Sequence, residues 1–397
     1  MRKKLCWILC SVGLWVACVD AAVVPLPEAQ KVTSTVSSTQ AHYGWSVNYP
    51  KQRKMFFIHK KLWVFYSDGS NAVYRTSDDG KTWSQPTLVK VNGHYGHRTG
   101  FSFDGTYLHY AHNAAAAGES VVYRRGKPNS SGKIQWSAEQ TVATVSTQHN
   151  VMYPKVIVDD KGYPWISYVL CKGGPHNAPY DAIVIKSSKN DGTWATAQNF
   201  PHILVANNPD SYPDVTGTPM LQGKTYWMVN QKKGEPYRGK LWNGSSWEKE
   251  ENVSLGGGAY GLFNLIAEGD TVHAVYLTRG AQYRKRDPKT GWGKEQLVMH
   301  SAGGHLSLTQ VGSQHLLVTW LDKHSQHVMM REVKNNQWGQ PTLIADESSM
   351  GLSGSETTKG INLNTLLTAT PTLQTAITYT VGTRAPFQLR FVGIKKP

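Results

Sequence analysis

The fold is decided by residues 72–89, which read Ala72-Val-Tyr-Arg-Thr-Ser-Asp-Asp-Gly80-Lys-Thr-Trp83-Ser-Gln-Pro-Thr-Leu-Val89. A β-prone run comes first, a Gly turn and a Trp follow, and a second β-prone run ends the stretch. Weaker copies of this unit place a Trp at Trp136, Trp194, Trp247, Trp292 and Trp338. The six Trp residues follow one another at intervals of 45 to 58 residues, close to the length of one four-stranded blade. The sequence therefore predicts an all-β fold, a β-propeller.

Seven blades can be laid along the chain. We expect blade one to contain strands at 45–48 and 54–66, and blades four, five and six to start near Tyr212, Tyr260 and His305. The seventh blade, residues 361–394, offers only three strands and no Trp. Its outer strand is expected from the N-terminal segment 28–36, which would close the ring and remove exposed sheet edges.

The first 21 residues resemble a secretory signal, because Arg2, Lys3 and Lys4 precede an apolar run and residues 19–21 are suited to cleavage. Residues 22–397 are then expected to form a single seven-bladed domain, extracellular or periplasmic. Lipid attachment at Cys18 is the alternative to free secretion. Cys171 would be the one remaining thiol, so no internal disulfide is expected and a large packed core must hold the fold.

The net charge and the motifs of the sequence indicate which class of molecule the protein binds. The formal net charge is +15, which favours anionic partners. No basic run or nucleic-acid-binding motif is visible, so an acidic polysaccharide or oligosaccharide fits an extracellular protein better than nucleic acid. We expect a monomer without a membrane span or a cofactor. Scattered histidines leave open a metal site assembled in space, although no cluster has the spacing of a zinc site.

The clearest repeat matches a known turn motif. The pattern Thr76-x-Asp78-x-Gly80-x-Thr82-Trp83 resembles the Asp-box repeat of sialidases and other Asp-box propellers. We expect a structural role: Gly80 takes positive φ, Asp78 accepts backbone N–H groups, and Trp83 wedges between sheets. Sialidases bind their substrate carboxylate with an arginine in an Arg-Ile-Pro motif, which this sequence lacks. The resemblance to sialidases therefore covers the fold only.

Histidines are expected to gather on the opposite face, in loops and at strand ends around the mouth of the central channel. The candidates are His94, His97, His112, His149, His176, His202, His300, His305, His324 and His327. Each alone is an ordinary loop residue. Several around one channel mouth would be a candidate site.

The sharpest group is His97, His112 and Tyr153. His97 begins an inner strand, His112 ends the strand that returns beside it, and Tyr153 begins the next inner strand. An imidazole and a phenol across a cleft are suited to removing the proton α to a carboxylate and protonating a leaving oxygen. Arg98 or Arg279 could neutralise the charge that this step places on a uronate.

This group is similar to the catalytic pattern of propeller polysaccharide lyases, the ulvan lyases and rhamnosyl-glucuronate lyases. The resemblance implies base, acid or positioning roles for His97, His112 and Tyr153. Two positions depart from the lyases: Arg98 stands where they often carry Asn, and Val169 stands where they usually carry a carboxylate-binding Arg. A related group of rhamnosidase-like propellers works with a histidine on the other face.

The leading hypothesis is thus a polysaccharide lyase acting by β-elimination on a uronic-acid-containing glycan, with Arg98, Arg279, Tyr212 and Tyr260 binding substrate. A glycoside hydrolase is the second, and it would need two carboxylates across the mouth. The candidates for that role are Asp68, Asp210, Asp214 and Asp322. The third is a glycan-binding propeller in which Trp45, Tyr212 and Tyr260 stack on sugars without chemistry.

Overall fold

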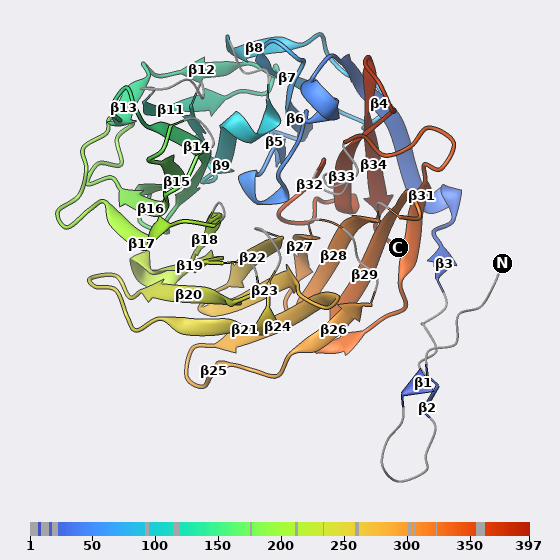
Figure 1. The fold of residues 1–397 in the computed structure, drawn as a ribbon. Coiled ribbons are helices and arrows are strands. Elements are labelled where there is room, and N and C mark those ends of the chain that lie inside the picture. Colours follow the sequence, from blue (N-terminus) through green and yellow to red (C-terminus); the bar gives the residue numbers. More distant parts are fainter. Residues whose placement is uncertain are drawn as a thin grey trace.

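The computed structural model describes residues 7–8, 16–17, 23–91, 95–113, 120–174, 177–210, 213–232, 234–258, 262–300, 304, 306–322, 324–354 and 362–397. Seven sheets follow one another around a ring, as the sequence predicts (Figure 1), and their strands are antiparallel except for one short N-terminal strand in the sixth sheet. The inner strands of most neighbouring blades contact each other around the axis. In the described part of the chain, no helix has the length and apolar character needed to cross a bilayer.

The first four blades are built from strands that follow one another in the chain. Blade 1 contains β5 (Met55–Ile58), β6 (Lys61–Ser67), β7 (Ala72–Ser77) and β8 (Thr87–Lys90). Blade 2 contains β9 (Thr99–Phe103), β10 (Leu108–His112), β11 (Val121–Pro128), β12 (Ile134–Trp136) and β13 (Gln140–Ala143). Blade 3 contains β14 (Asn150–Val158), β15 (Pro164–Cys171), β16 (Tyr180–Lys186) and β17 (His202–Asn208). Blade 4 contains β18 (Val215–Pro219), β19 (Thr225–Val229), β20 (Pro236–Trp242) and β21 (Glu251–Gly257).

The last three blades complete the ring, and two of them take strands from the N-terminus. Blade 5 contains β22 (Phe263–Glu268), β23 (Thr271–Leu277), β24 (Ala281–Asp287), β25 (Gly291–Trp292) and β26 (Gln296–Met299). Blade 6 contains β27 (Leu306–Gly312), β28 (His315–Asp322), β29 (His327–Lys334), β30 (Gln337–Trp338), β31 (Thr342–Asp346) and β3 (Val24–Pro25). Blade 7 contains β32 (Leu363–Thr365), β33 (Leu373–Val381), β34 (Phe387–Lys395) and β4 (Lys31–Thr39).

Short elements make up the rest. Two strands, β1 (Trp7–Ile8) and β2 (Val16–Ala17), pair with each other outside the seven sheets. Five 3₁₀ turns are described: η1 (Glu28–Gln30), η2 (His42–Gly44), η3 (Pro50–Gln52), η4 (Gly96–Arg98) and η5 (Leu221–Gly223).

Ring closure by an N-terminal strand is confirmed. β4 pairs antiparallel with β34, from Lys31 opposite Ile394 to Thr39 opposite Phe387. The strand begins three residues later than the sequence suggested, because residues 28–30 after Pro27 form the turn η1. The two ends of the described propeller therefore share one sheet.

Each junction between neighbouring blades has its own buried apolar cluster. The six repeat tryptophans all pack against the cluster shared with the preceding blade: Trp83, Trp136, Trp194, Trp247, Trp292 and Trp338. Aromatic rings supply large apolar contact areas at such junctions. The repeat seen in the sequence is thus the repeat of blade-to-blade packing.

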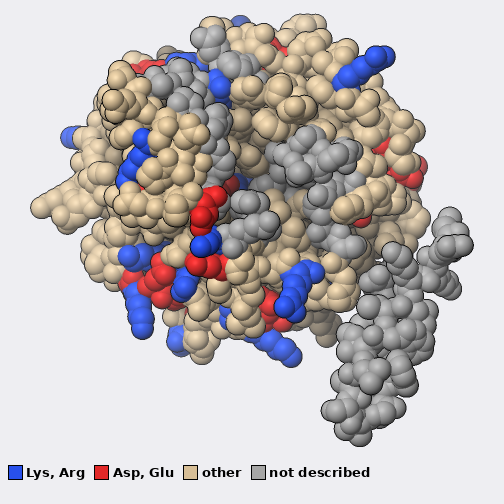
Figure 2. Space-filling view, in the orientation of Figure 1, with Lys and Arg blue, Asp and Glu red and all other residues tan. Residues whose placement is uncertain are grey.

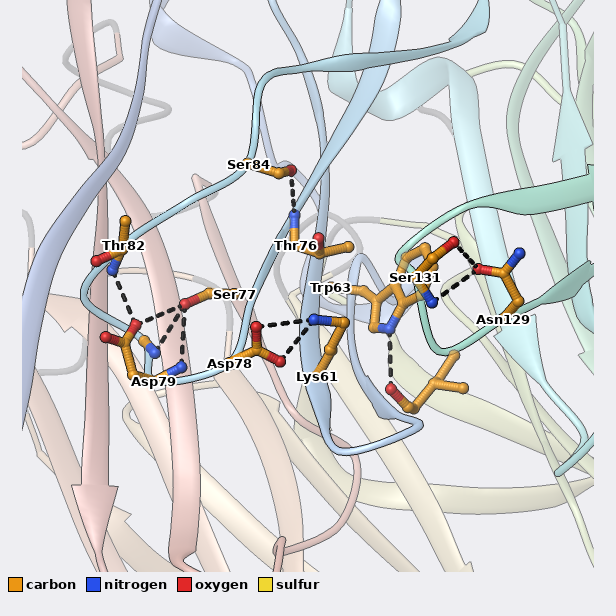
Figure 3. A network of polar contacts seen from close by, with 12 residues as sticks. Lys61, Trp63, Thr76, Ser77, Asp78, Asp79, Thr82, Ser84, Asn129 and Ser131 are labelled. Atoms are coloured by element: carbon orange, nitrogen blue, oxygen red, sulfur yellow. Dashed lines mark hydrogen bonds and ion pairs between the residues drawn. The ribbon is translucent and has the colours of Figure 1, made fainter.

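Figure 3 shows the polar contacts of the turn after β7, the turn that leads to Trp83. Asp79, and not Asp78 as expected, accepts the backbone N–H groups of Lys81 and Thr82, at 2.8 and 2.9 Å. Asp78 instead points to the Lys61 ammonium, 2.6 Å away. Gly80 has the expected positive φ, 71°. The turn delivers Trp83 to blade 7, where its indole N–H donates to Ser34 Oγ at 2.9 Å.

The first blade corrects one sequence expectation. Residues 45–48 form no strand, and residues 54–66 form two strands separated by a turn at His59 and Lys60, both with positive φ. Trp45 is partly exposed, but Ser46, Val47 and Asn48 are all buried, because here the chain crosses toward the ring axis. There it forms η3, which contacts the inner strands β9, β14, β22, β27 and β32.

Candidate functional site

The segment 45–54, which contains η3, lies at the centre of the ring and places the charged side chain of Lys51 there. Lys51 and Lys155 both form ion pairs with Asp214, and all three side chains are less than a tenth exposed. Burial opposes ionisation of Asp214, but the two ammonium groups outweigh it and hold the pKa of its carboxyl at about 2. Burial lowers the pKa of Lys51 to about 8 despite the attraction of Asp214. The centre of the ring therefore contains a buried cluster of three charges, in which the Asp214 carboxylate is shared by the Lys51 and Lys155 ammonium groups.

Gln52 joins this segment to the predicted site residues. Its amide nitrogen donates to the His97 carbonyl at 2.7 Å and to the Pro154 carbonyl at 2.9 Å. Its amide oxygen accepts the Tyr49 N–H and the Lys54 ammonium, both at 3.3 Å. Since both polar atoms of the amide are used, Gln52 fixes the residues that precede β9 relative to the bulge in β14.

Tyr153 stands on a β-bulge. The pairing of β14 with β15 shifts between Met152 and Lys155, so that two residues oppose one on the partner strand. Tyr153 has φ 55°, the left-handed region that a bulky residue rarely adopts. Bulges of this kind re-aim a side chain and are frequent beside functional sites. The bulge turns the Tyr153 ring toward His97, with the ring centroids 5.3 Å apart.

His97 is surrounded by aromatic rings. Tyr95 stacks on it at 5.2 Å, and Trp45 lies 5.9 Å away, centroid to centroid. Tyr49 is 6.3 Å from the His97 ring and 5.4 Å from the Tyr153 ring. His97 itself is only 7% exposed. Burial raises the pKa of the Tyr49 phenol well above its usual range, and a hydrogen bond from Tyr153 partly offsets this.

An open aromatic surface continues from this cluster. Tyr43 is 47% exposed, and its ring lies 5.4 Å from that of Trp45. His42 contacts Tyr43, Trp45 and Tyr95 edge-on. The cluster of His42, Tyr43, Trp45 and Tyr95 therefore offers aromatic faces and edges to a ligand beside the buried His97.

His112 ends β10 opposite Thr99, so it lies close in the sheet to His97, but deeper. It is 2% exposed and stacks on Tyr110. Burial, together with the charges of Lys90, Arg98 and Arg124, lowers the pKa of His112 to about 3. The imidazole is therefore neutral at ordinary pH and cannot give up a proton as an imidazolium.

The four expected substrate-binding residues have different outcomes. Arg98 is buried beside His112, and its guanidinium lies over the Tyr95 ring at 4.7 Å. Arg279 is exposed in the turn between β23 and β24. Tyr212 and Tyr260 lie outside the described residues, so their predicted roles stay predictions.

Charged side chains of both signs gather over the region of β20 and β21 on the face shown in Figure 2.

Three of the ten candidate histidines, His94, His176 and His305, also lie outside the described residues. His202 is placed wrongly by the sequence: it begins the outer strand β17 and stacks on Trp247 at 4.4 Å, at the junction of blades 3 and 4. The sequence predicted a loop at the channel mouth for His202. The outer strand of blade 3 instead starts there, eight residues after Trp194. No group of three or more His, Cys, Asp or Glu in the described ranges is placed to hold a metal ion.

The carboxylates considered for hydrolysis are all used locally. Asp214 is held by two lysines. Asp68 accepts the backbone N–H groups of Ser70 and Asn71, both at 2.8 Å. Asp210 pairs with Lys232 at 3.0 Å, and Asp322 accepts the Ser325 hydroxyl at 2.8 Å.

Tyr49, Lys51, Gln52 and Lys155 were missed from the sequence. Lysines are almost never fully buried, so Lys51 and Lys155 read as surface residues. The signal in the sequence is the run of aromatic residues and Gly at 43–49, of which residues 45–48 were predicted to be a strand.

Comparison with known proteins supports the fold. No protein-family profile matches the sequence, and no curated protein is similar to it in sequence. The polysaccharide lyase Uly1 superposes with a TM-score of 0.51 at 8% identity, over 86% of this chain and 89% of that chain. The Hadza microbial sialidase Hz136 gives 0.48 at 13% identity, over 82% of this chain and 73% of that chain.

A sialidase of Trypanosoma rangeli gives a TM-score of 0.48 at 11% identity over 87% of this chain, which spans only 55% of that sialidase. Identities this low concern the fold alone. On the evidence of its seven sheets and of the superposition on Uly1, the chain is a seven-bladed β-propeller closed by its N-terminal strand.

Proposed function

We propose that this protein is a lyase that cleaves a uronic-acid-containing polysaccharide by β-elimination. The observation that carries the proposal is the bulge at Tyr153, which holds a strained residue so that its phenol faces His97. Backbone strain of this kind costs about 1–3 kcal/mol and persists where surrounding structure enforces it. Gln52 contributes to that enforcement by donating to the backbone carbonyls of His97 and of Pro154, the residue after Tyr153.

The reaction needs a base, an acid and a cation. The base removes the proton at C5 of the uronate, the electron pair forms the C4–C5 double bond, and the bond from C4 to the glycosidic oxygen breaks. That oxygen then takes a proton from the acid. His97 and Tyr153 are the pair that we assign to these two transfers.

His112 and Arg98 are assigned supporting roles. The neutral His112, whose pKa is about 3, can accept or donate a hydrogen bond but adds no positive charge. Arg98, beside it, supplies the cation that offsets the second negative charge on the uronate. Arg279 would reach a more distant part of the polymer.

The surroundings suit a sugar acid. The open cluster of His42, Tyr43, Trp45 and Tyr95 can stack on sugar rings, and the net charge of +15 favours a polyanionic substrate. We infer secretion after removal of residues 1–21, since the substrate is extracellular. Hydrolysis by two carboxylates is less well supported, because Asp68, Asp210, Asp214 and Asp322 are each held by local partners.

The test is the ultraviolet absorbance of the unsaturated uronate, followed while the protein is incubated with a panel of uronic-acid polysaccharides. We expect the absorbance to rise with the wild-type protein. His97→Gln and Tyr153→Phe should each lower the rate about 10²-fold or more, because a positioned proton-transfer group is lost. His324→Ala, on the exposed β28–β29 turn, is the matched control and should leave the rate unchanged.

Other outcomes identify the alternatives. New reducing ends without absorbance would overturn elimination in favour of hydrolysis. Saturable binding of a polysaccharide with neither product would point to a glycan-binding propeller. Equal rates in His97→Gln, Tyr153→Phe and His324→Ala would remove the site from these residues even if elimination occurred.

A further inference from the structure

A cavity lies at the end of the inner strands that is opposite to His97. Its volume is about 180 Å³, and its walls include Phe56, Phe57, Phe103, Leu366 and Pro371. Phe103 ends β9, whereas His97 precedes the start of that strand. Four strand steps separate Thr99 from Phe103, which is roughly 13 Å at the usual rise per residue. The cavity is therefore distinct from the site around His97.

One charged residue lines this cavity, and it is Arg53. Its Nη1 donates to the Leu308 carbonyl at 3.3 Å. No ion pair joins Arg53 to a carboxylate in the part of the chain that the structure describes. A guanidinium has five N–H donors, so one carbonyl leaves most of its donor capacity for other partners.

The environment of Arg53 makes an isolated cation expensive. Burial lowers the pKa of the guanidinium to about 10, and no neighbouring carboxylate opposes that effect. The backbone at Arg53 has φ 25°, within the left-handed region. Arg53 is partly exposed, a charge largely withdrawn from water is normally paired, and the residues that line the cavity include no carboxylate.

The nearby axis adds positive charge. Lys51, Lys54 and Lys155 are buried there, and Asp214 is the carboxylate that pairs with two of them. Lys54 has Gln52 as a neutral partner. The positive field of these groups favours an anion next to Arg53 over a neutral molecule.

We propose that this cavity is a binding site for a small organic carboxylate, with Arg53 holding the carboxylate and the phenylalanine walls covering the apolar face of the ligand. Guanidinium and carboxylate are matched in shape and form two parallel hydrogen bonds. Ser102 and Thr368, which also line the cavity, provide hydroxyl groups for other polar atoms. The site is independent of the proposed lyase chemistry.

The test is thermal unfolding of the full-length protein with sodium benzoate, benzyl alcohol or sodium chloride, the two salts at matched ionic strength. Ligand that binds only the folded state raises the unfolding midpoint. We expect benzoate, a carboxylate with an apolar face that is not a uronate, to raise the midpoint, and benzyl alcohol and chloride to leave it unchanged. In titration calorimetry, Arg53→Gln should weaken benzoate binding about tenfold or more, since hydrogen bonds to a charged group are lost.

A matched control tests whether the loss is specific to the cavity. Arg384→Gln, at an exposed arginine in the turn between β33 and β34, should bind benzoate like the wild-type protein. If Arg53→Gln fails to fold, Leu367→Asp gives a second test: Leu367 is 43% exposed at the cavity, and the new carboxylate would compete for Arg53. Binding that survives Arg53→Gln or Leu367→Asp, or that disappears equally in Arg384→Gln, would overturn the proposal.

Discussion

At the scale of single residues, the unusual feature is a set of lysines buried at the ring axis. Lys51 has a fully buried side chain and shares Asp214 with Lys155. Buried ion pairs add little net stability, yet removing one partner leaves an uncompensated charge. The Gln52 side chain forms four further hydrogen bonds. Its amide oxygen accepts from Lys54 and from the Tyr49 N–H, and its amide nitrogen donates to the carbonyls of His97 and Pro154. The axis is therefore a polar network whose members depend on one another.

Asp214→Asn tests this dependence. Two ammonium groups would lose their counter-charge, and we expect the free energy of unfolding at neutral pH to fall by about 3–5 kcal/mol. Asp210→Asn is the matched control, because Asp210 pairs with Lys232 at the surface and such pairs contribute at most about 1 kcal/mol. Urea denaturation measures both. Equal losses in the two variants would contradict the central role of Asp214.

The difference in stability between the wild-type protein and Asp214→Asn should depend on pH. The folded-state pKa of Asp214, about 2, lies below its ordinary value of 3.8. The unfolded chain therefore binds the proton first, and the stability supplied by the carboxylate is present above pH ~4 and is lost as the pH falls to about 2. The stability gap between the wild-type protein and Asp214→Asn should narrow over that range. A gap independent of pH would show that the amide acts through packing instead.

At the scale of elements, the sequence predicts the repeated parts of the fold and misses the unique one. Trp83 and its five counterparts mark six of the seven blades, because each packs into the junction with the preceding blade. Strand β9 is predicted to the residue, since Gly and Asp turns flank it. The crossing at 45–54 occurs once, and the carboxylate that pairs with its Lys51 is Asp214, which is distant in the sequence. His112 ends β10 as predicted. His97, however, lies in η4 just before β9, and Tyr153 is the fourth residue of β14, at the bulge, and does not begin that strand.

Gly80→Ala tests the Trp turn as an element. A Cβ at Gly80 would lie 2.7 Å from Phe391 of blade 7, and its φ is 71°. Gly291 has φ 76° with nothing within 4 Å of its Cβ. Gly291→Ala should therefore cost only the backbone strain, about 1–2 kcal/mol, while Gly80→Ala adds about 1–3 kcal/mol of overpacking. Thermal or urea unfolding distinguishes them, and equal costs would mean that Phe391 moves aside without loss.

At the scale of the whole molecule, stability depends on closing the ring, and β4 is the closing element. Val36 of β4 is 2% exposed and packs in the cluster between blades 7 and 1. Val36→Asp would bury an unpaired charge there, and we expect a loss of about 3 kcal/mol or more together with aggregation, because β34 becomes an exposed edge. Val24→Asp, at a position 51% exposed in β3, is the control. Unfolding midpoints and light scattering compare the two. If Val36→Asp remains as stable and monodisperse as Val24→Asp, the other blades hold the ring without its closing strand, and the closure seen in the sheet pairing carries little of the stability.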